Sequence, residues 1–255
     1  MSAATHVADQ GLTAMARRLT WSAASLDELC ARASGEQLGF LAQAMSTELA
    51  HRDQARRDRL FKTARFPVPK SFAGFDWDHV RLPAALPRAD LQDGAFITRA
   101  ENLVLFGPVG TGKTHLACAI GQAACARGVP VRFATVTDLT VELATAKTDG
   151  RLAKTLAAIG KAQVLILDEF GYVPIDRDAA RLLFEVIAEA YETRTLIITT
   201  NVPFSGWGTI LTDDQMAAAM IDRIAHHGHL INFTGASYRM RHALMRTDNQ
   251  ARSTP

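Results

Sequence analysis

Short apolar runs alternate along most of the chain with longer segments in which apolar residues recur at spacings of three and four. Continuous runs of Val, Leu and Ile are typical of strands buried on both faces of a parallel sheet, and the wider spacing is typical of amphipathic helices. The pattern therefore predicts an α/β fold, a parallel five-stranded sheet with helices on both faces. The expected strands cover 102–106, 130–135, 163–168, 195–200 and 229–233, and the expected helices cover 113–126, parts of 138–159, 177–191 and 213–226.

The segment from Leu12 to Leu60 has only the helical spacing, and Gly35 separates two sets of apolar residues. We expect at least two helices there. The stretch Phe-Pro-Val-Pro at 66–69 ends the pattern and predicts a hinge, because proline cannot continue a helix. The expected organisation is a small N-terminal helical domain at 1–66, the α/β domain at 67–247 and a polar tail at 248–255.

An eight-residue motif follows the first expected strand and opens the next helix. It matches the pattern G-x-x-x-x-G-K-[ST] in full. In such a loop the glycines let backbone N–H groups surround phosphates, and the helix N-terminus favours negative charge. We expect Lys113 to reach the β- and γ-phosphates and the Thr114 hydroxyl to ligate Mg²⁺. The residues expected to bind a nucleoside triphosphate are Gly107, Pro108, Val109, Gly110, Thr111, Gly112, Lys113, Thr114 and His115.

Two adjacent acids, Asp168 and Glu169, end a later apolar run. An acidic turn can follow any buried strand, but downstream of a phosphate loop the pair favours a hydrolase over a passive nucleotide binder. Asp168 is expected to hold Mg²⁺ through water, and Glu169 to polarise the attacking water. Small-molecule kinases and GTPases have the phosphate loop without needing the second acid here.

Asn201 follows the next expected strand, where it could hydrogen-bond the γ-phosphate or the attacking water. The alternative is a turn-forming asparagine before Val202 and Pro203. Arg223 lies in a later helix, and by itself it is typical of a surface ion-pair partner. Phe72, Phe75 and Trp77 are expected to pack in the core of the α/β domain or to lie near the base of the bound nucleotide, and core packing is favoured.

Composition indicates an ordinary soluble protein of 255 residues, 48% hydrophobic and 21% charged. Cys30, Cys118 and Cys125 form no C-x-x-C pair and indicate packed thiols in a reducing compartment. No apolar run approaches the ~20 residues that span a bilayer, and no export signal is recognisable, so we expect a cytoplasmic protein with no membrane partner.

Positive charge is concentrated between His51 and Lys70, although the whole chain carries only +2. That segment has seven cations and two anions, a net charge of +5. A basic block suits a nucleic-acid phosphate backbone, and the alternative is a solvated helix face. The residues proposed to contact DNA in this block are Arg52, Arg56, Arg57, Arg59 and Lys62.

The order of these motifs resembles the AAA+ ATPases of the initiator and DnaC-like helicase-loader branch. More specific pieces resemble the IstB-type helper ATPases of insertion-sequence transposition, over residues from about 10 to 246. Those pieces are Phe-Ser-Gly-Trp-Gly at 204–208, Met-Ile-Asp-Arg at 220–223 and Ser-Tyr-Arg at 237–239.

The resemblance implies an ATP- and Mg²⁺-dependent ATPase that assembles into a ring or spiral of identical subunits. Such an oligomer binds and bends double-stranded DNA without sequence preference and recruits or activates a partner transposase. By motif position, Arg223 is expected to complete a neighbouring subunit's site, and Arg239 to sense the nucleotide. Too few residues follow the last strand for a full C-terminal lid. The resemblance also puts a DNA-facing insertion at Lys147, Arg151 and Lys154, which could equally be a solvated helix face.

Three other functions remain open on the sequence. A replicative helicase loader would use similar machinery but favour single strands. A small-molecule kinase would transfer phosphate without DNA, and a scaffold would bind ATP without hydrolysing it, although the paired acids argue against a scaffold. The close histidines His226, His227 and His229 could suggest a metal, but without a fourth ligand or a supporting acid a loop at the helix end is favoured.

Overall fold

The computed structural model describes residues 3–238, and the chain divides into two compact units, Met1–Arg59 and Leu60–Pro255. The first unit consists of helices, in agreement with its spacing of apolar residues. Ser22 begins the second helix by accepting a hydrogen bond from the N–H of Ser25 at 3.1 Å. The core of this unit includes Leu12, Leu26 and Met45. Its helices are α1 (Ala3–Arg18), α2 (Ala23–Arg32) and α3 (Gly35–Ala64), of which α3 continues into the second unit.

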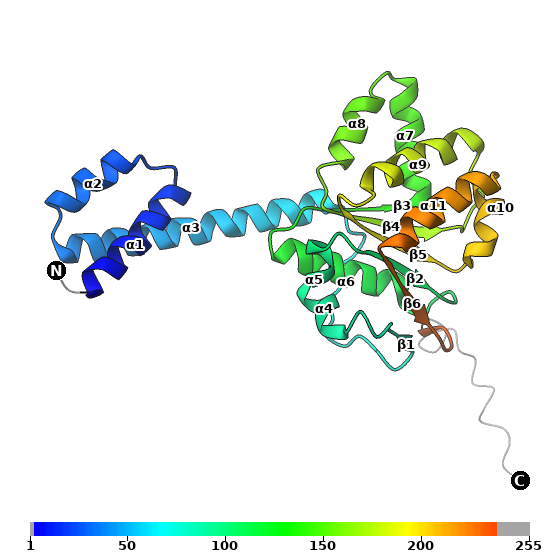
Figure 1. Cartoon of the computed structure of the whole chain (residues 1–255), viewed down its shortest axis with the longest axis horizontal. Helices are drawn as coiled ribbons and strands as arrows, with labels where there is room; N and C mark the ends of the chain where they lie inside the picture. The colour runs from blue at the N-terminus through cyan, green and yellow to red at the C-terminus, as the bar shows by residue number, and fades with distance from the viewer. Residues whose placement is uncertain (1–2, 239–255) are drawn as a thin grey trace, which may run out of the picture. The chain divides into compact units, whose positions relative to one another are not determined.

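The second unit is built around one sheet, which has six strands within the described residues. The order is β1-β6-β2-β5-β4-β3, and the last five are mutually parallel (Figure 1). The expected five-stranded parallel sheet is therefore confirmed. The antiparallel β1 was not predicted, because a two-residue strand has no periodicity to recognise. The strands are β1 (Val80–Arg81), β2 (Asn102–Phe106), β3 (Val131–Thr135), β4 (Val164–Phe170), β5 (Thr195–Thr200) and β6 (Gly228–Phe233).

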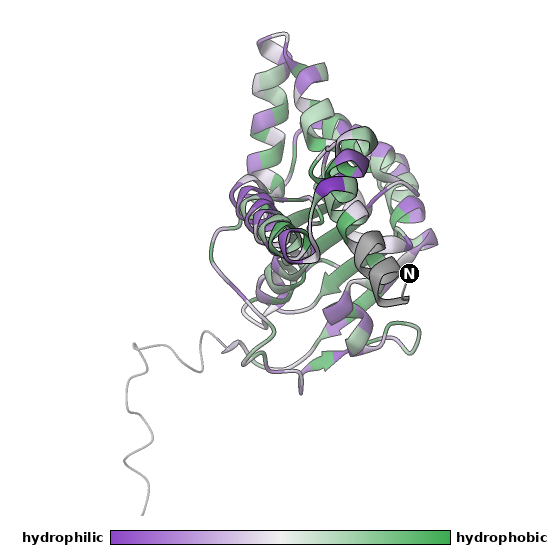
Figure 2. Ribbon diagram, turned by 90° about the vertical axis from the view of Figure 1, so that its left-hand side faces the viewer, coloured by the Kyte–Doolittle hydropathy of each residue, from purple (hydrophilic) through white to green (hydrophobic). Residues whose placement is uncertain are grey.

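Helices cover both faces of this sheet, as the apolar strands require (Figures 1 and 2). Leu165 and Leu167 of β4 pack in one hydrophobic cluster, whereas Val164 and Ile166 pack in the other. Alternate residues of a strand point to opposite faces, so one apolar run supplies both clusters. The helices of this unit are α4 (Arg88–Asp93), α5 (Ala95–Thr98), α6 (Lys113–Ala126), α7 (Val136–Thr148), α8 (Leu152–Ile159), α9 (Arg177–Ala190), α10 (Trp207–Leu211) and α11 (Asp214–His226), with a short 3-10 turn at Phe204–Gly206.

Cys118 and Cys125 of α6 are fully buried in the cluster that α6 forms with the sheet. Burial disfavours a thiolate and raises the pKa of Cys125 to about 11. These two residues are packed thiols, as expected. Within residues 3–238, no helix is both long and apolar enough to cross a membrane.

Candidate nucleotide site

The phosphate-loop motif connects the end of β2 to the start of α6. Gly107 (φ +151°), Gly110 (φ +80°) and Gly112 (φ +101°) all have positive φ values that side chains rarely adopt. A Cβ atom at Gly107 would collide with the carbonyl oxygen of Phe233, and one at Gly110 with the hydroxyl of Ser237. The loop geometry therefore depends on glycine.

Lys113 is the first residue of α6, and its side chain turns back over the loop. Its Nζ donates to the carbonyl oxygens of Gly107 and Pro108, each at 2.7 Å. The Thr111 hydroxyl donates to the same Pro108 oxygen at 2.8 Å. The ammonium group thus lies within the loop that is expected to surround the phosphates.

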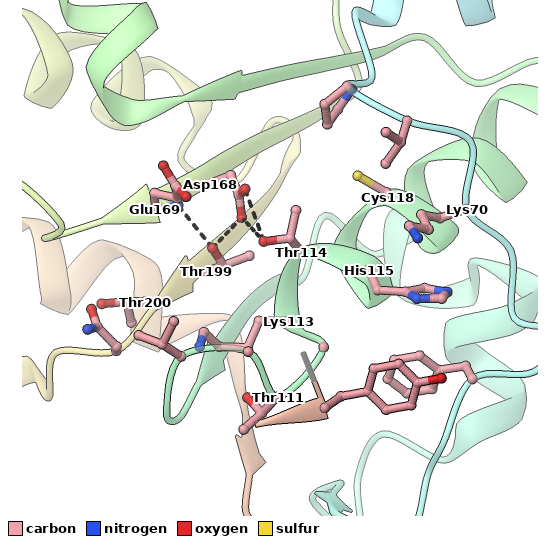
Figure 3. A pocket seen from close by; sticks show the side chains of 18 of the residues that line it. Lys70, Thr111, Lys113, Thr114, His115, Cys118, Asp168, Glu169, Thr199 and Thr200 are labelled. Atoms are coloured by element: carbon pink, nitrogen blue, oxygen red, sulfur yellow. Dashed lines mark hydrogen bonds between the residues drawn. The ribbon is translucent and has the colours of Figure 1, made fainter. Parts of the chain in front are cut away.

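Asp168 lies near the end of β4 and faces the start of α6 across the sheet edge. Its side chain is buried, with 4% of the residue exposed. The Thr114 hydroxyl donates to its two carboxylate oxygens at 2.9 and 3.1 Å, and the Thr199 hydroxyl donates to one of them (Figure 3). The two residues expected to ligate Mg²⁺ are in direct contact, although 54 positions separate them.

A β-bulge in β4 brings the second acid to the same cavity. The register between β4 and β5 shifts between Leu167 and Phe170, and Glu169 has a φ of +61°. Successive side chains of a regular strand point to opposite faces, but both Asp168 and Glu169 line the cavity. Thr199 holds the bulge by accepting the backbone N–H of Glu169 at 3.0 Å.

Thr199 is a site residue that the sequence did not identify. It contacts both acids through one hydroxyl group, donating to Asp168 and accepting from the backbone of Glu169. In the sequence it is one of several β-branched residues in an expected strand. Only the pairing of β5 beside β4 reveals its position.

Asn201 follows β5 and lines the same cavity, with an exposed side chain. The loop after it is fixed by a buried indole: Trp207 donates to the carbonyl oxygen of Val202 at 3.3 Å and packs on Phe170 with ring centroids 4.1 Å apart. The Phe-Ser-Gly-Trp motif therefore has a packing role, since it anchors the loop that carries Asn201.

The cavity has a volume of about 660 Å³ and extends from the phosphate loop to the segment after the expected hinge. His115 Nε2 donates a hydrogen bond to the carbonyl oxygen of Ser71, 3.0 Å away, and the ring packs edge-on against Phe75 with centroids 5.2 Å apart. Phe75 also packs against Trp77 at 4.9 Å. Phe72, Phe75 and Trp77 pack against the buried cluster, as the core expectation requires, and Phe75 also lines the cavity. Their place near the nucleotide base stays a prediction.

Cys118 also lines the cavity, one turn into α6. Burial, together with the nearby negative charge of Asp168, raises the pKa of its thiol to about 12. This thiol stays protonated at neutral pH and is not a candidate nucleophile.

The family model for IstB-like ATP binding proteins matches residues 10–246 of this chain. The chain belongs to this family. A protein of insertion sequence IS5376 from Geobacillus stearothermophilus, named for ATP binding, is 38% identical over 213 residues, 83% of this chain and 84% of the relative. A protein of insertion sequence IS21 from Pseudomonas aeruginosa, named likewise, is 36% identical over 223 residues, 88% of this chain and 84% of the relative.

Solved structures show the same fold. DnaI aligns with a TM-score of 0.53 and 22% identity, over 66% of this chain and 89% of DnaI. The DnaC helicase loader aligns with a TM-score of 0.50 and 19% identity, over 69% of this chain and 99% of the loader. This IstB-like chain has the fold of the P-loop AAA+ proteins.

The arginine that the family resemblance puts at a subunit interface does not line the cavity of this IstB-like chain. Arg223 lies on α11, where it donates to the carbonyl oxygen of Ala219 at 3.0 Å and packs over the ring of Phe184 at 5.0 Å. Arg239 lies outside the described residues. Ser237 and Tyr238, its neighbours in the motif, lie at the phosphate loop, where the Tyr238 N–H donates to Gly110 at 2.9 Å.

The basic residues proposed to contact DNA lie on three helices and a connecting turn, and all except Arg57 are exposed. Arg52 pairs with Glu48 at 2.7 Å, and Arg151 pairs with Asp149. Arg57 is half-buried and donates to Gln54 at 2.9 Å. Those on α3 are Arg52, Arg56, Arg57, Arg59 and Lys62, and those around α7 and α8 are Lys147, Arg151 and Lys154.

Proposed function

We propose that this chain is an ATP-hydrolysing, DNA-binding subunit of an oligomer that assists transposition of an insertion sequence in the cytoplasm. The observation that carries the proposal is the contact of Thr114, Asp168 and Thr199 beside the phosphate loop, with Glu169 turned into the same cavity. Membership of the IstB-like family and relatives from insertion sequences support the transposition role.

The residues at the sheet edge fit a magnesium nucleotide. A hydroxyl and a buried carboxylate offer the oxygen ligands that Mg²⁺ prefers, and glycine backbone groups with Lys113 suit phosphate oxygens. When bound, Mg²⁺ would neutralise charge on the β- and γ-phosphates. Thr199 would keep Asp168 oriented toward Thr114 and hold the bulge at Glu169.

Glu169 is the proposed base that orients and polarises the attacking water. Its side chain is exposed to the cavity, unlike that of Asp168, so a water molecule can reach it. Asn201, at the end of the adjacent strand, is proposed to hydrogen-bond the same water or the γ-phosphate. The bulge separates the two roles, because the buried acid serves the metal and the exposed acid serves the water.

Arg223 is proposed to complete the site of a neighbouring subunit. A guanidinium supplied from another subunit stabilises charge on the transferring phosphoryl group. Its place on α11, away from the cavity of its own chain, supports this role. ATP would then favour a ring or spiral, and hydrolysis would weaken the interface.

DNA binding is proposed to use the basic positions of α3 and of the α7–α8 region. Each subunit offers a few exposed cations, and repetition along an oligomer would neutralise many phosphates without reading bases. The proposed outcome is a bent duplex target that recruits or activates a partner transposase.

The test is the ATP hydrolysis rate with and without long duplex DNA, for wild type and Arg223→Ala, with particle mass measured in the same samples. The proposal expects duplex-stimulated hydrolysis and ATP-dependent assembly, both lost in Arg223→Ala. Stimulation by single strands alone would indicate a helicase loader. A monomer whose ATP hydrolysis rate is the same with and without DNA, and in wild type and Arg223→Ala, would contradict the proposal and favour a kinase. Assembly without hydrolysis would indicate a scaffold.

A further inference from the structure

A second group of ligand-type side chains lies at the opposite edge of the sheet from the nucleotide cavity. Glu192 lies in the turn between α9 and β5, His226 ends α11, and His227 precedes β6. The amino ends of parallel strands meet at one edge, which brings the two turns together. The histidines are neighbours in sequence, whereas the acid comes from 34 positions before His226.

The ligand atoms of these three residues all lie within 4.8 Å of one another. His227 Nε2 lies 3.4 Å from Glu192 Oε1, and His226 Nδ1 lies 4.0 Å from the same oxygen. The imidazole centroids are 4.2 Å apart, and the Tyr191 hydroxyl lies 2.9 Å from His226 Nδ1. Two ring nitrogens and one carboxylate oxygen therefore lie close enough together to bind one ion.

Ion pairing alone explains this arrangement poorly. The three side chains are about half exposed, and exposed ion pairs contribute little to stability. Two protonated imidazoles at this separation would also repel each other. A neutral imidazole has one nitrogen lone pair, and a cation would use that of His227 Nε2 and would take the place of the Tyr191 hydroxyl at His226 Nδ1.

We propose that Glu192, His226 and His227 bind a divalent transition-metal ion of the zinc type. Imidazole nitrogens with one carboxylate suit Zn²⁺, Ni²⁺ or Cu²⁺, whereas Mg²⁺ and Ca²⁺ prefer oxygen ligands throughout. Three protein ligands on an exposed surface leave a further coordination position for water. His229 takes no part, because its Nε2 lies 3.1 Å from Glu101 instead.

A bound ion would join two elements that are otherwise linked only by packing and weak polar contacts. His226 is the last residue of α11 and His227 follows it, and Glu192 follows α9, the helix whose Phe184 packs under Arg223 of α11. Binding to the folded state alone stabilises a protein by mass action, so the ion would raise the melting temperature.

The experiment titrates Zn²⁺ into the full chain, freed of any affinity tag, by isothermal titration calorimetry without nucleotide. Millimolar Mg²⁺ in the buffer occupies oxygen-only sites such as Thr114 and Asp168 and does not compete for imidazole. We expect a saturable site in wild type, weakened about ten-fold or more in His227→Ala and in Glu192→Gln. His229→Ala is the matched control, a nearby histidine outside the cluster, and should bind Zn²⁺ as wild type does.

Circular dichroism establishes that each variant is folded, and Co²⁺ absorption in the visible region reports nitrogen ligation. Loss of the Co²⁺ bands in His227→Ala but not in His229→Ala would support the site. Absence of saturable Zn²⁺ binding in wild type would overturn it, as would equal affinity in wild type, His227→Ala and Glu192→Gln. Neither result depends on ATP or DNA, so failure of this site leaves the proposed function standing.

Discussion

The nucleotide cavity and the basic surfaces differ in how the fold holds their charged groups. At the cavity, Asp168 is buried and accepts hydrogen bonds from Thr114 and Thr199, which come from two other elements. The proposed DNA contacts lie on helix surfaces and a turn, and Arg52, Arg57 and Arg151 have polar partners on the same helix or turn. The function of the cavity therefore depends on one arrangement of its side chains, whereas DNA binding by the surfaces depends on how many cations they present.

This difference determines how each region should respond to substitution. Removing one member of a buried, hydrogen-bonded group leaves its partners unsatisfied and costs a large part of the function. Removing one exposed cation from several costs a small and roughly additive share of affinity. The four predictions below test this contrast, from the largest expected effect to the smallest.

Lys113→Ala removes the ammonium group from the phosphate loop. Because that group is expected to contact the β- and γ-phosphates, ATP affinity should fall by about 100-fold or more, and assembly with it. The measurement is equilibrium binding of a fluorescent ATP analogue. Lys161→Ala, an exposed lysine outside the cavity, should bind the analogue as wild type does; equal binding by Lys113→Ala would refute the assignment.

Glu169→Gln keeps the size of the side chain and removes its basicity. Hydrolysis should slow by about 10²- to 10⁴-fold while ATP binding and assembly persist, so the DNA-bound state should accumulate. Single-turnover hydrolysis with particle mass measures both effects. Glu185→Gln, an exposed acid on α9, is the control. Hydrolysis by Glu169→Gln at the wild-type rate would remove Glu169 from its proposed role.

Thr199→Val removes the hydroxyl that contacts both acids. The unsatisfied N–H of Glu169 and the less restrained Asp168 should lower the free energy of unfolding by about 1–3 kcal/mol and slow hydrolysis about ten-fold. Chemical denaturation and steady-state kinetics measure the two quantities. Thr199→Ser, which retains the hydroxyl, should recover most of the rate.

Thr195 offers a matched control on the same strand. Its hydroxyl is buried and has no hydrogen-bond partner among the described residues. Thr195→Val should therefore be neutral or stabilising. If Thr195→Val lowered the free energy of unfolding and the hydrolysis rate as much as Thr199→Val, any change in β5 would be harmful. That result would contradict the specific role of Thr199.

Single alanine substitutions of Arg52, Arg56 or Arg59 should lower duplex affinity by less than about ten-fold. The triple variant should combine these losses and reduce the slope of log affinity against log salt by about 0.9 per arginine. Fluorescence anisotropy at several salt concentrations measures both. Arg32→Ala, also on the first unit and exposed, should leave the slope unchanged. A single substitution that abolished binding would contradict a distributed surface.

The sequence predicted those parts of the molecule that depend on neighbouring residues in the chain. The apolar runs identified β2 to β6, and the phosphate loop and the paired acids are contiguous motifs. Thr199 was missed because its role depends on β5 pairing beside β4, and the bulge that turns Glu169 into the cavity is invisible in an apolar run. Glu192 was missed beside the histidines for the same reason, since only the sheet brings the two turns together.

The most direct test of a shared site mixes two variants that are each inactive. Arg223→Ala keeps an intact cavity but supplies no arginine, and Glu169→Gln supplies the arginine but lacks the base. If Arg223 acts on a neighbouring subunit, an equal mixture should regain hydrolysis that neither variant has alone, because the intact cavity of Arg223→Ala can receive the arginine that Glu169→Gln supplies. A mixture with no more activity than its separate components would contradict a site completed by a neighbouring subunit.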